Sequence, residues 1–229
     1  EAMTLATKIC LIDNGVLQQY DAPLDVYNRP NSLFVADFVG NPAINFIEAA
    51  GKQRADGAIE LSLLGGKSAV FRPKQPLDLA KWYADEDAKD ADKKTREAEL
   101  AKDKKHVEKA NKDEPFRYHI SRVNEEDDSI QDDPVLTNED LVLGIRPEFI
   151  EITGSGGLEG EIYGAMPTGM ESTIKVRVDD YLLTGVVFGS TVFKLGTKIR
   201  IVVKSGNIML FDRKSGECIA LGSLEFPGE

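Results

Sequence analysis

The chain has 229 residues, of which 41% are hydrophobic and 29% charged, a composition typical of folded globular proteins. Its formal net charge of -11 repels nucleic-acid backbones and anionic lipid, so a role in tracking phosphate groups is disfavoured. No apolar run approaches the roughly 20 residues of a membrane span. Cys10 and Cys218 give no disulfide framework, and we expect both to be buried in a reducing compartment.

The first forty residues predict a helix, a β-hairpin and two further short helices. The hairpin is expected because Asn14-Gly15 supplies the positive φ angles of a type I′ turn between two apolar runs. The next stretch predicts a helix that ends before Pro30, with Asp21 as its cap and Pro23 in its first turn.

A further helix is predicted in the segment NSLFVADFVG, where Asn31 or Ser32 caps the start and Gly40 marks the end. These elements are too small to enclose a core by themselves. We therefore expect their apolar face to be frayed or covered by a second copy of the chain. The residues that need such a surface are Ile9, Leu11, Phe34 and Phe38.

From Asn45 onward, short apolar stretches alternate with turns rich in glycine, aspartate and serine. Their spacing of roughly ten residues predicts a small barrel or sandwich, so the expected fold class is mainly β. TIKVRV and KIRIVV alternate strictly, so each should bury one face. The predicted strands are NFIEA, AIELSLL, SAVFRP, LVLGIRPEFIEI, LEGEIYGAM, STIKVRVDD, YLLTGVV, TKIRIVVK, NIMLFD and ECIALG.

A highly charged segment, residues 85–114, interrupts these strands. Acidic residues precede basic ones by four positions, as in Asp85 and Lys89, an order that supports an exposed helix by roughly 0.2–0.5 kcal/mol per pair. Trp82 and Tyr83 should anchor one end of this helix, and the acidic run NEEDDSIQDD after it predicts a loop. We expect a solvated excursion, and a partner-binding element is the alternative.

No arrangement of residues predicts an active site. The GGKS stretch lacks the first glycine of a phosphate-binding loop, because Leu61 stands there, and predicts a turn. GSGGLEG carries Glu159 where a dinucleotide-binding loop needs glycine, and predicts a flexible linker. The histidines, His106 and His119, have no metal-binding partners at suitable spacing. We therefore expect no catalytic, cofactor-binding or metal site in this chain.

Several motifs together resemble the ATP-binding subunits of sugar-type ABC importers, the maltose, multiple-sugar and glycerol-phosphate group. EAMTLATKI, LIDNGVLQQYDAPLDVYNRP, LFVADFVG and NPAINF follow one another in the family's order. The later segments LVLGIRPEFIEI, PTGMEST and KSGNIMLFDRKSGECI resemble the family's C-terminal accessory domain. The resemblance covers residues 1–79 and 134–229 and leaves out the charged insertion.

The resemblance implies two domains. Residues 1–40 would be the C-terminal remnant of a nucleotide-binding domain, and residues 41–229 an OB-like β-barrel accessory domain interrupted by a charged helical insertion at 80–133. In the family the catalytic motifs lie before this part, so this chain would not itself be an enzyme. The parent subunit would use ATP and magnesium. Phe149 departs from the family pattern, which has histidine at this position.

The implied function is that of a regulatory and dimerisation region for an importer ATPase. The implied partners are a second copy of the subunit, the importer's membrane subunits, and a regulatory protein or small effector, at the cytoplasmic face of the cell membrane. The expected contact surface comprises Arg146, Pro147, Glu148, Met170 and Glu171. For the arginine and proline, the alternative is a structural role at the start of an edge strand.

Two other functions are compatible with the sequence. The chain could be a free-standing OB-like module that binds an oligosaccharide or a small anion. Nucleic acid is not expected as a ligand, because it requires a basic groove with exposed aromatic residues. The interpretation that the chain is a structural protein acting through its charged helix is supported by composition alone.

Overall fold

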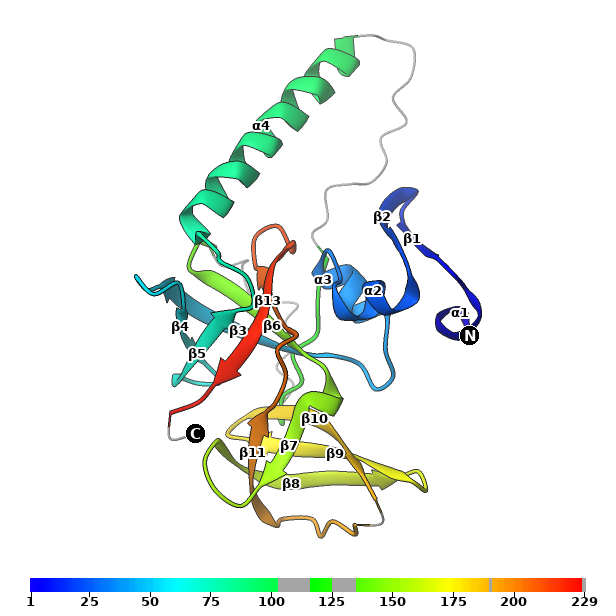
Figure 1. The fold of residues 1–229 in the computed structure, drawn as a ribbon, viewed down its shortest axis with the longest axis vertical. Coiled ribbons are helices and arrows are strands. Elements are labelled where there is room, and N and C mark those ends of the chain that lie inside the picture. Colours follow the sequence, from blue (N-terminus) through cyan, green and yellow to red (C-terminus); the bar gives the residue numbers. More distant parts are fainter. Residues whose placement is uncertain (103–115, 125–134, 190, 228–229) are drawn as a thin grey trace.

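The computed structural model describes residues 1–102, 116–124, 135–189 and 191–227. Its centre is a closed antiparallel barrel with the strand order β12-β13-β5-β4-β3-β6 (Figure 1). The predicted fold class, mainly β with an OB-like barrel, is confirmed. The barrel strands are β3 (Asn45–Gln53), β4 (Ile59–Leu63), β5 (Lys67–Pro73), β6 (Asp140–Ile145), β12 (Ile208–Asp212) and β13 (Cys218–Glu225).

A second, five-stranded sheet lies below the barrel in Figure 1 and has the order β10-β9-β8-β11-β7. The predicted strands are present and are divided between the barrel and this sheet, except that LVLGIRPEFIEI, predicted as one strand, is broken by a turn at Pro147 into β6 and β7. The 3-10 turn η2 (Pro147–Phe149) leads from the barrel into the second sheet. The strands of the second sheet are β7 (Ile150–Thr153), β8 (Leu158–Pro167), β9 (Glu171–Val178), β10 (Tyr181–Phe188) and β11 (Lys198–Val203).

The predicted one-sided burial holds for one of the two alternating strands. In β9 the buried residues alternate with more exposed ones along the strand. In β11, by contrast, Ile201, Val202 and Val203 are all buried in succession. The prediction for KIRIVV was therefore wrong, because the end of this strand is covered on both faces.

The barrel and the second sheet share one hydrophobic core. Side chains from the barrel, such as Phe71 and Leu143, belong to the same buried cluster as Ile174 and Leu183 of the sheet. Burial of apolar surface stabilises a fold by roughly 25 cal/mol per Å², so a common core favours one cooperative body.

The N-terminal unit, residues 1–40, lies beside the barrel and carries the predicted elements (Figure 1). Asn14 and Gly15 have φ angles of 47° and 79°, as the hairpin prediction required. Ser32 caps the last helix by accepting a hydrogen bond from the amide of Val35. The elements are α1 (Ala2–Leu5), β1 (Ile9–Asp13), β2 (Val16–Asp21), α2 (Pro23–Asn28) and α3 (Leu33–Phe38).

Two predictions for this unit were wrong. Asp21 does not cap α2, because it belongs to β2 and accepts a hydrogen bond from Gln19, while Ala22 occupies the cap position. Cys10 is exposed, because it alternates with the buried Leu11 along β1 and points away from the unit's interior. Cys218 is half-buried, and burial raises its thiol pKa to about 12.

The N-terminal unit has a small core of its own, formed by Leu11, Val26, Val35 and Val39. Its helix α3 also packs on the barrel, where Leu33 and Ala36 join a second buried cluster. The barrel thus supplies part of the surface that the apolar residues of this region need. The barrel members of this second cluster are Ile44, Phe46, Val142, Met209 and Phe211.

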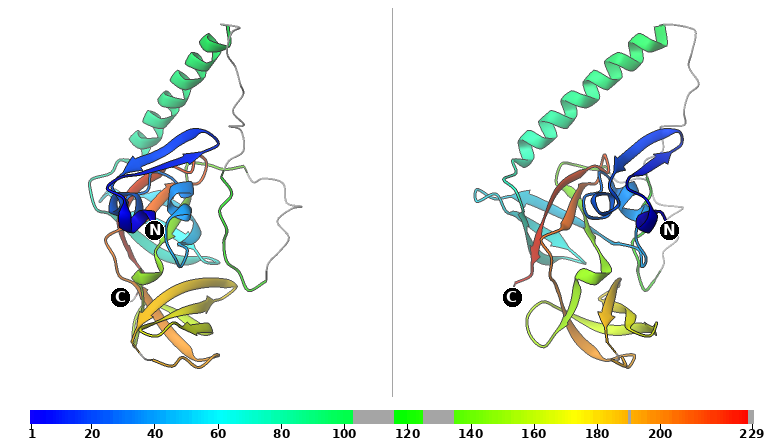
Figure 2. Two further views of the ribbon diagram at one scale, coloured as in Figure 1. Left: turned by 90° about the vertical axis from the view of Figure 1, so that its right-hand side faces the viewer. Right: turned by 45° about the vertical axis from the view of Figure 1, so that its right-hand side comes forward.

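The charged segment begins with α4 (Leu79–Lys102), which projects away from the barrel (Figure 2). The predicted anchor is confirmed: Tyr83 is buried, and its hydroxyl donates to Asp212 over 3.0 Å. The ion pairs along its first turns are Lys81–Asp85 and Glu86–Lys89. The expected helix beyond residue 102 and most of the acidic run lie outside the described residues.

Residues 116–124, which lie within the predicted insertion at 80–133, contact the folded body. The Tyr118 hydroxyl donates to Glu48 over 2.9 Å, and its ring packs against Phe46. The amide of Leu182 donates to the carbonyl of Ser121. The predicted insertion therefore contacts the body at its start and again at residues 118–121.

Both glycine-rich stretches connect strands. The GGKS stretch forms the turn between β4 and β5, and GSGGLEG connects β7 with β8. A side chain at Gly157 would lie 2.1 Å from the carbonyl oxygen of Ile201, so this position requires glycine. The predicted turn at GGKS and the predicted position of GSGGLEG between two strands are confirmed.

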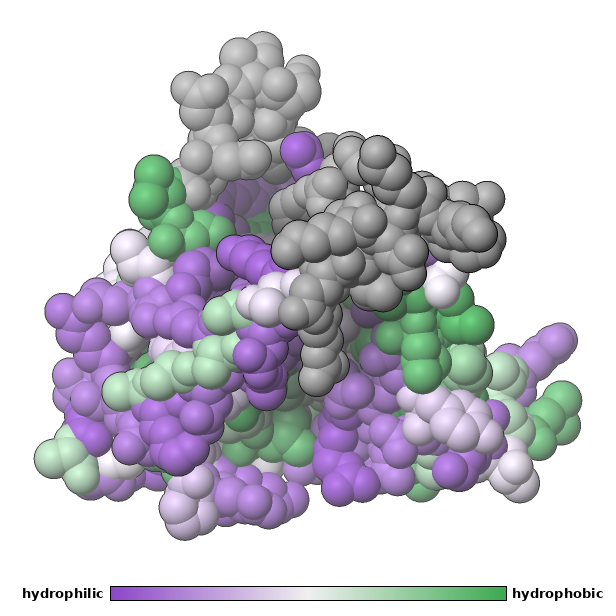
Figure 3. All heavy atoms as spheres, turned by 90° about the horizontal axis from the view of Figure 1, so that it is seen from above, coloured by the Kyte–Doolittle hydropathy of each residue, from purple (hydrophilic) through white to green (hydrophobic). Residues whose placement is uncertain are grey.

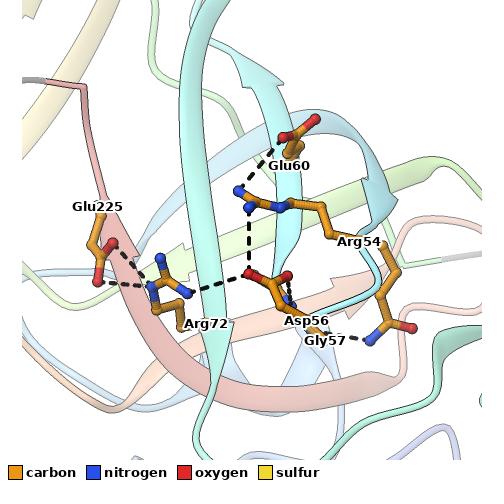
Figure 4. A network of polar contacts seen from close by, with 8 residues as sticks. Arg54, Asp56, Gly57, Glu60, Arg72 and Glu225 are labelled. Atoms are coloured by element: carbon orange, nitrogen blue, oxygen red, sulfur yellow. Dashed lines mark hydrogen bonds and ion pairs between the residues drawn. The ribbon is translucent and has the colours of Figure 1, made fainter.

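An ion-pair network covers one outer face of the barrel (Figure 4). Arg72 of β5 lies 3.1 Å from Glu225 of β13 and 3.9 Å from Asp56, and Asp56 also contacts Arg54 at 3.4 Å. Exposed pairs of this kind contribute at most about 1 kcal/mol each. The network connects the last barrel strand, β13, with β5 and with the turn between β3 and β4.

Candidate functional site

The expected contact surface is divided between two places. Met170 and Glu171 lie at the turn between β8 and β9, and Met170 is 86% exposed. Arg146, Pro147 and Glu148 lie where the chain passes from the barrel into the second sheet, and of these Glu148 is exposed. The structure does not bring the two groups together into one patch.

Arg146 and Pro147 correct the prediction of a surface position. Arg146 is 0% exposed, and Pro147 is buried as well. For Arg146 the reason is that the N-terminal unit packs over the end of β6 and covers the guanidinium. Neither can contact a partner directly in this arrangement.

The guanidinium of Arg146 binds the ends of both neighbouring helices. Nη1 donates to the carbonyl oxygens of Ala36 and Val39 over 3.1 and 2.5 Å, and Nη2 donates to that of Tyr27 over 2.9 Å. These carbonyls belong to the C-terminal turns of α3 and α2, which lack intrahelical partners. One side chain from the barrel therefore caps two helices of the N-terminal unit.

The positive charge of Arg146 is balanced by dipoles rather than by a direct ion pair. Helix C-termini carry a partial negative charge, and two of them face this guanidinium. The ring of Tyr27 lies 4.0 Å from the guanidinium carbon and adds a cation–π contact. Burial lowers the pKa of Arg146, but an arginine remains charged in proteins. Its Nε has no hydrogen-bond partner among the described residues.

Tyr27 connects this buried charge with the surface. Its hydroxyl donates to Oε1 of Glu148 over 2.7 Å. Burial and the Glu148 carboxylate raise the pKa of Tyr27 to about 12. We call these three residues, Tyr27, Arg146 and Glu148, the Arg146 junction.

A second polar contact lies one residue before Arg146. The buried Asn45 donates from Nδ2 to the carbonyls of Ile145 and Thr184 over 3.1 and 2.8 Å, and its Oδ1 accepts from the Thr184 amide over 2.7 Å. Thr184 belongs to β10, so Asn45 ties the barrel to the second sheet. Its amide is therefore fully used between the two layers.

A groove of about 950 Å³ separates the N-terminal unit from the β12–β13 turn. Its cationic residues are already engaged: Arg29 pairs with Asp25 at 2.5 Å, Arg213 pairs with Glu48, and Lys214 bonds to Asn138. Leu17, Phe34 and Phe116 provide apolar lining. Its size fits a small molecule. Arg29 and Arg213 are already paired with carboxylates, whereas the partner of Lys214 is an uncharged amide.

Two groups of apolar side chains are exposed. One lies on the N-terminal unit, and hydrophobic side chains reach the surface on that side of the molecule (Figure 3). The other lies at one end of the second sheet. The first comprises Leu5, Ile12, Leu17, Tyr20, Leu24 and Phe38, and the second Met166, Met170, Phe188, Val192 and Leu195.

The described residues contain no group of three or more His, Cys, Asp or Glu side chains that could hold a metal ion. Within the same residues, no helix is both long and apolar enough to cross a membrane.

Sequence reasoning missed Tyr27 and Asn45. Asn45 starts a predicted strand, where a polar residue is normally exposed, and its two partners lie 100 and 139 residues away. Tyr27 lies in a predicted helix without any local signal of a distant partner. The sequence predicts Gly40 as the end of a helix. The structure adds a second reason for glycine there, because a side chain would lie 2.9 Å from Nη1 of Arg146.

The homologues of this chain are ABC transporter ATP-binding proteins, which confirms the resemblance inferred from the sequence. The uncharacterized ABC transporter ATP-binding protein y4oS of Sinorhizobium fredii is 26% identical over 221 residues, 96% of this chain and 43% of that protein. The sn-glycerol-3-phosphate import ATP-binding protein UgpC of Escherichia coli K12 is 44% identical over 84 residues, 34% of this chain and 24% of UgpC.

The uncharacterized ABC transporter ATP-binding protein YcjV of Escherichia coli O6:H1 is 40% identical over 79 residues, 34% of this chain and 22% of that protein. The chain thus spans less than half the length of these curated relatives. No protein-family model matches it.

Proposed function

We propose that this chain is the C-terminal regulatory and dimerisation region of the ATP-binding subunit of an ABC importer for sugars or related solutes. The observation that carries the proposal is the similarity to an ABC transporter ATP-binding protein over 96% of the chain. UgpC, an importer subunit by its name, supports the choice of an importer for a sugar-like or glycerol-phosphate-like solute.

The exposed apolar face of the N-terminal unit supports this proposal. Leu5, Leu24 and Phe38 are 82%, 70% and 65% exposed, and several large apolar side chains exposed on one small unit favour an interaction site. In the proposed parent, the nucleotide-binding part covers this face. ATP and magnesium bind to that part, and the importer's membrane subunits contact the chain through it.

The barrel and second sheet form the proposed regulatory body. Glu148, Met170 and Glu171 are its candidate contacts with a second copy of the subunit, with a regulatory protein or with a small effector. Binding at such a surface changes the rate of transport only if it favours the open or the closed arrangement of the two subunits. The proposed location is the cytoplasmic face of the membrane.

The test uses a longer protein that contains this chain, reconstituted with its membrane subunits. Its ATP hydrolysis and solute uptake are compared with those of a version that ends after residue 40. We expect both to hydrolyse ATP, with a changed rate or lost response to a regulator in the shortened version. A longer protein without ATPase activity contradicts the parentage, and identical rates and responses contradict the regulatory role.

The groove gives limited support to a free-standing ligand-binding module. Its volume of about 950 Å³ suits a small oligosaccharide. A small anion is less favoured, because Arg29, Arg213 and Lys214 already have partners. Calorimetry with maltose, glycerol 3-phosphate and sulfate tests this alternative: a free-standing binding module predicts heat of binding from at least one of them, and no heat from any of them contradicts it.

A further inference from the structure

Residues 145–148 form a corner at which three parts of the molecule meet. At Ile145, the carbonyl accepts a hydrogen bond from Asn45, which also binds both backbone groups of Thr184 in the second sheet. At the next residue, Arg146 binds the two helices of the N-terminal unit. Adjacent residues at the end of β6 are thus tied to two different parts of the molecule, Ile145 to the second sheet through Asn45 and Arg146 to the N-terminal unit.

The helices α2 and α3 are held differently. The start of α3 is also fixed to the β12–β13 turn, where the Leu33 amide donates to the Gly216 carbonyl over 2.8 Å. For α2, the hydrogen bonds to the barrel side within the described residues run through Arg146 and Glu148. This corner therefore contributes to the position of α2 and of the hairpin that precedes it. A second tie exists, because Gln19 of β2 accepts a hydrogen bond from the Asn31 amide and the Asn31 carbonyl accepts one from the amide of Cys218 in β13.

The corner has little space for local adjustment. Gly40 has a φ of 117°, and a Cβ there would lie 2.9 Å from Nη1 of Arg146 and 3.3 Å from the Tyr27 ring. Pro147 is buried directly after the arginine and restricts the backbone. A displacement of the end of β6 must therefore move the guanidinium and its helices together.

We propose that the corner of residues 145–148 is a coupling element that transmits displacements of the second sheet to α2 and the β1–β2 hairpin. The path runs from Thr184 through Asn45 and Ile145 to Arg146 and Tyr27. This inference stands on the contacts of this chain and does not rest on the proposed function. In an importer subunit it would connect the accessory domain with the nucleotide-binding part.

The test measures amide hydrogen exchange at residues 16–29 in a double-mutant cycle on the full chain. Asn45→Ala removes the tie to the second sheet, and Arg146→Lys removes the shared cap, because an ammonium cannot reach three carbonyls in the same fork. We expect each change alone to raise exchange at residues 16–29 about tenfold, as the loss of one or more buried hydrogen bonds implies. In the double variant, the effect of Asn45→Ala should vanish.

Arg200→Lys is the matched control. Arg200 also binds two backbone carbonyls, those of Gly156 and Gly157, but both lie within the second sheet. This variant should leave exchange at residues 16–29 unchanged. A rise as large as that from Arg146→Lys would overturn the inference, as would an unchanged exchange in Asn45→Ala or additive effects in the double variant.

A second set of variants keeps the test decisive if Arg146→Lys does not fold. Glu148→Gln and Tyr27→Phe weaken only the exposed end of the junction. Combined with Asn45→Ala, they should show the same departure from additivity at residues 16–29 with a smaller size. Strict additivity in both combinations contradicts the coupling element.

Discussion

A buried arginine without a direct ion pair is rare. The hydrogen bonds of Arg146 explain why the fold tolerates one here. The three carbonyls that it binds end two helices, so the charge meets partial negative charge from several directions. Arginine suits this role better than lysine because its planar group carries five donors. The free-energy cost of burying the charge is offset by its hydrogen bonds to these helix carbonyls, which would otherwise lack donors.

Replacing Arg146 with methionine should lower the free energy of unfolding by about 3 kcal/mol, because it leaves buried carbonyls without donors while keeping the side-chain volume. Urea denaturation followed by circular dichroism measures this change. Arg213→Met is the control: its ion pair with Glu48 is partly exposed and should contribute under about 1 kcal/mol. Equal losses in the two variants would contradict the special role of Arg146.

Tyr27 predicts a loss of stability at high pH. Its pKa is raised from 10.0 to about 12, so between these values the folded state holds a proton that the unfolded state has released. The contribution is present below pH 10 and disappears as the pH rises to about 12. Amide exchange within α2 should increase over this window, and Tyr27→Phe should remove the Tyr27 part of that pH dependence. A transition of unchanged size in the variant argues against this assignment.

The sequence predicted that the stretch around Arg146 forms contacts, but it predicted an exposed arginine, and Arg146 is buried. Fully buried arginines are uncommon, so an arginine after an apolar strand is expected to face solvent. Its burial depends on helices more than a hundred residues away, as the separations of 107–119 residues between hydrogen-bond partners show. No local pattern could reveal that packing. Cys10 is the opposite case, since its exposure follows from the alternation along β1.

At the scale of elements, the strand positions followed from alternation and turn residues, whereas their partners did not. The hairpin at Asn14-Gly15 and the turn of the GGKS stretch depend on nearby residues and were predicted correctly. The division into a barrel and a second sheet depends on pairings such as Gly222 with Pro73. These pairings are set by the packing of the whole core.

The contact between α4 and the β12–β13 turn predicts a stabilising substitution. Burial and the neighbouring Glu86 raise the pKa of Glu217, which means that its ionised form is disfavoured in the folded protein. The favourable contribution is present below the unfolded pKa and is lost as the pH rises through the folded one. Glu217→Gln should therefore raise the melting temperature slightly at neutral pH, by less than about 1 kcal/mol in stability because the site is partly exposed.

Glu225→Gln is the matched control for this change. Glu225 lies 3.1 Å from Arg72, so its neutralisation removes a favourable contact and should not stabilise the protein. Calorimetric melting curves at neutral pH and at pH 4 separate the two cases, because the gain from Glu217→Gln should shrink at the lower pH. A decrease in melting temperature from Glu217→Gln would contradict the repulsion.

At the scale of the whole molecule, the two exposed apolar groups predict two kinds of association. We expect Met170→Asp to weaken self-association through the second sheet by about tenfold or more, since it places a charge in an apolar contact. Leu24→Asp is the companion variant on the N-terminal unit and should leave that contact intact. Light scattering over a concentration series measures the dissociation constant.

The outcomes distinguish the two surfaces. If Leu24→Asp alone weakens the dimer, the chains associate through the face that the proposed nucleotide-binding part would cover. A chain that is strictly monomeric at high concentration contradicts self-association as a property of this region.

The closure of the barrel has a consequence for the order in which the protein can form. The strands β3 to β6 are made before the second sheet, but the barrel closes only when β12 and β13 join them. During synthesis, the early strands therefore wait with unpaired edges while the five strands of the second sheet leave the ribosome. Contacts so distant in sequence also slow refolding. We expect ribosome-bound chains that stop before residue 208 to be sensitive to proteases and to recruit chaperones, and chains extended through β13 to become resistant.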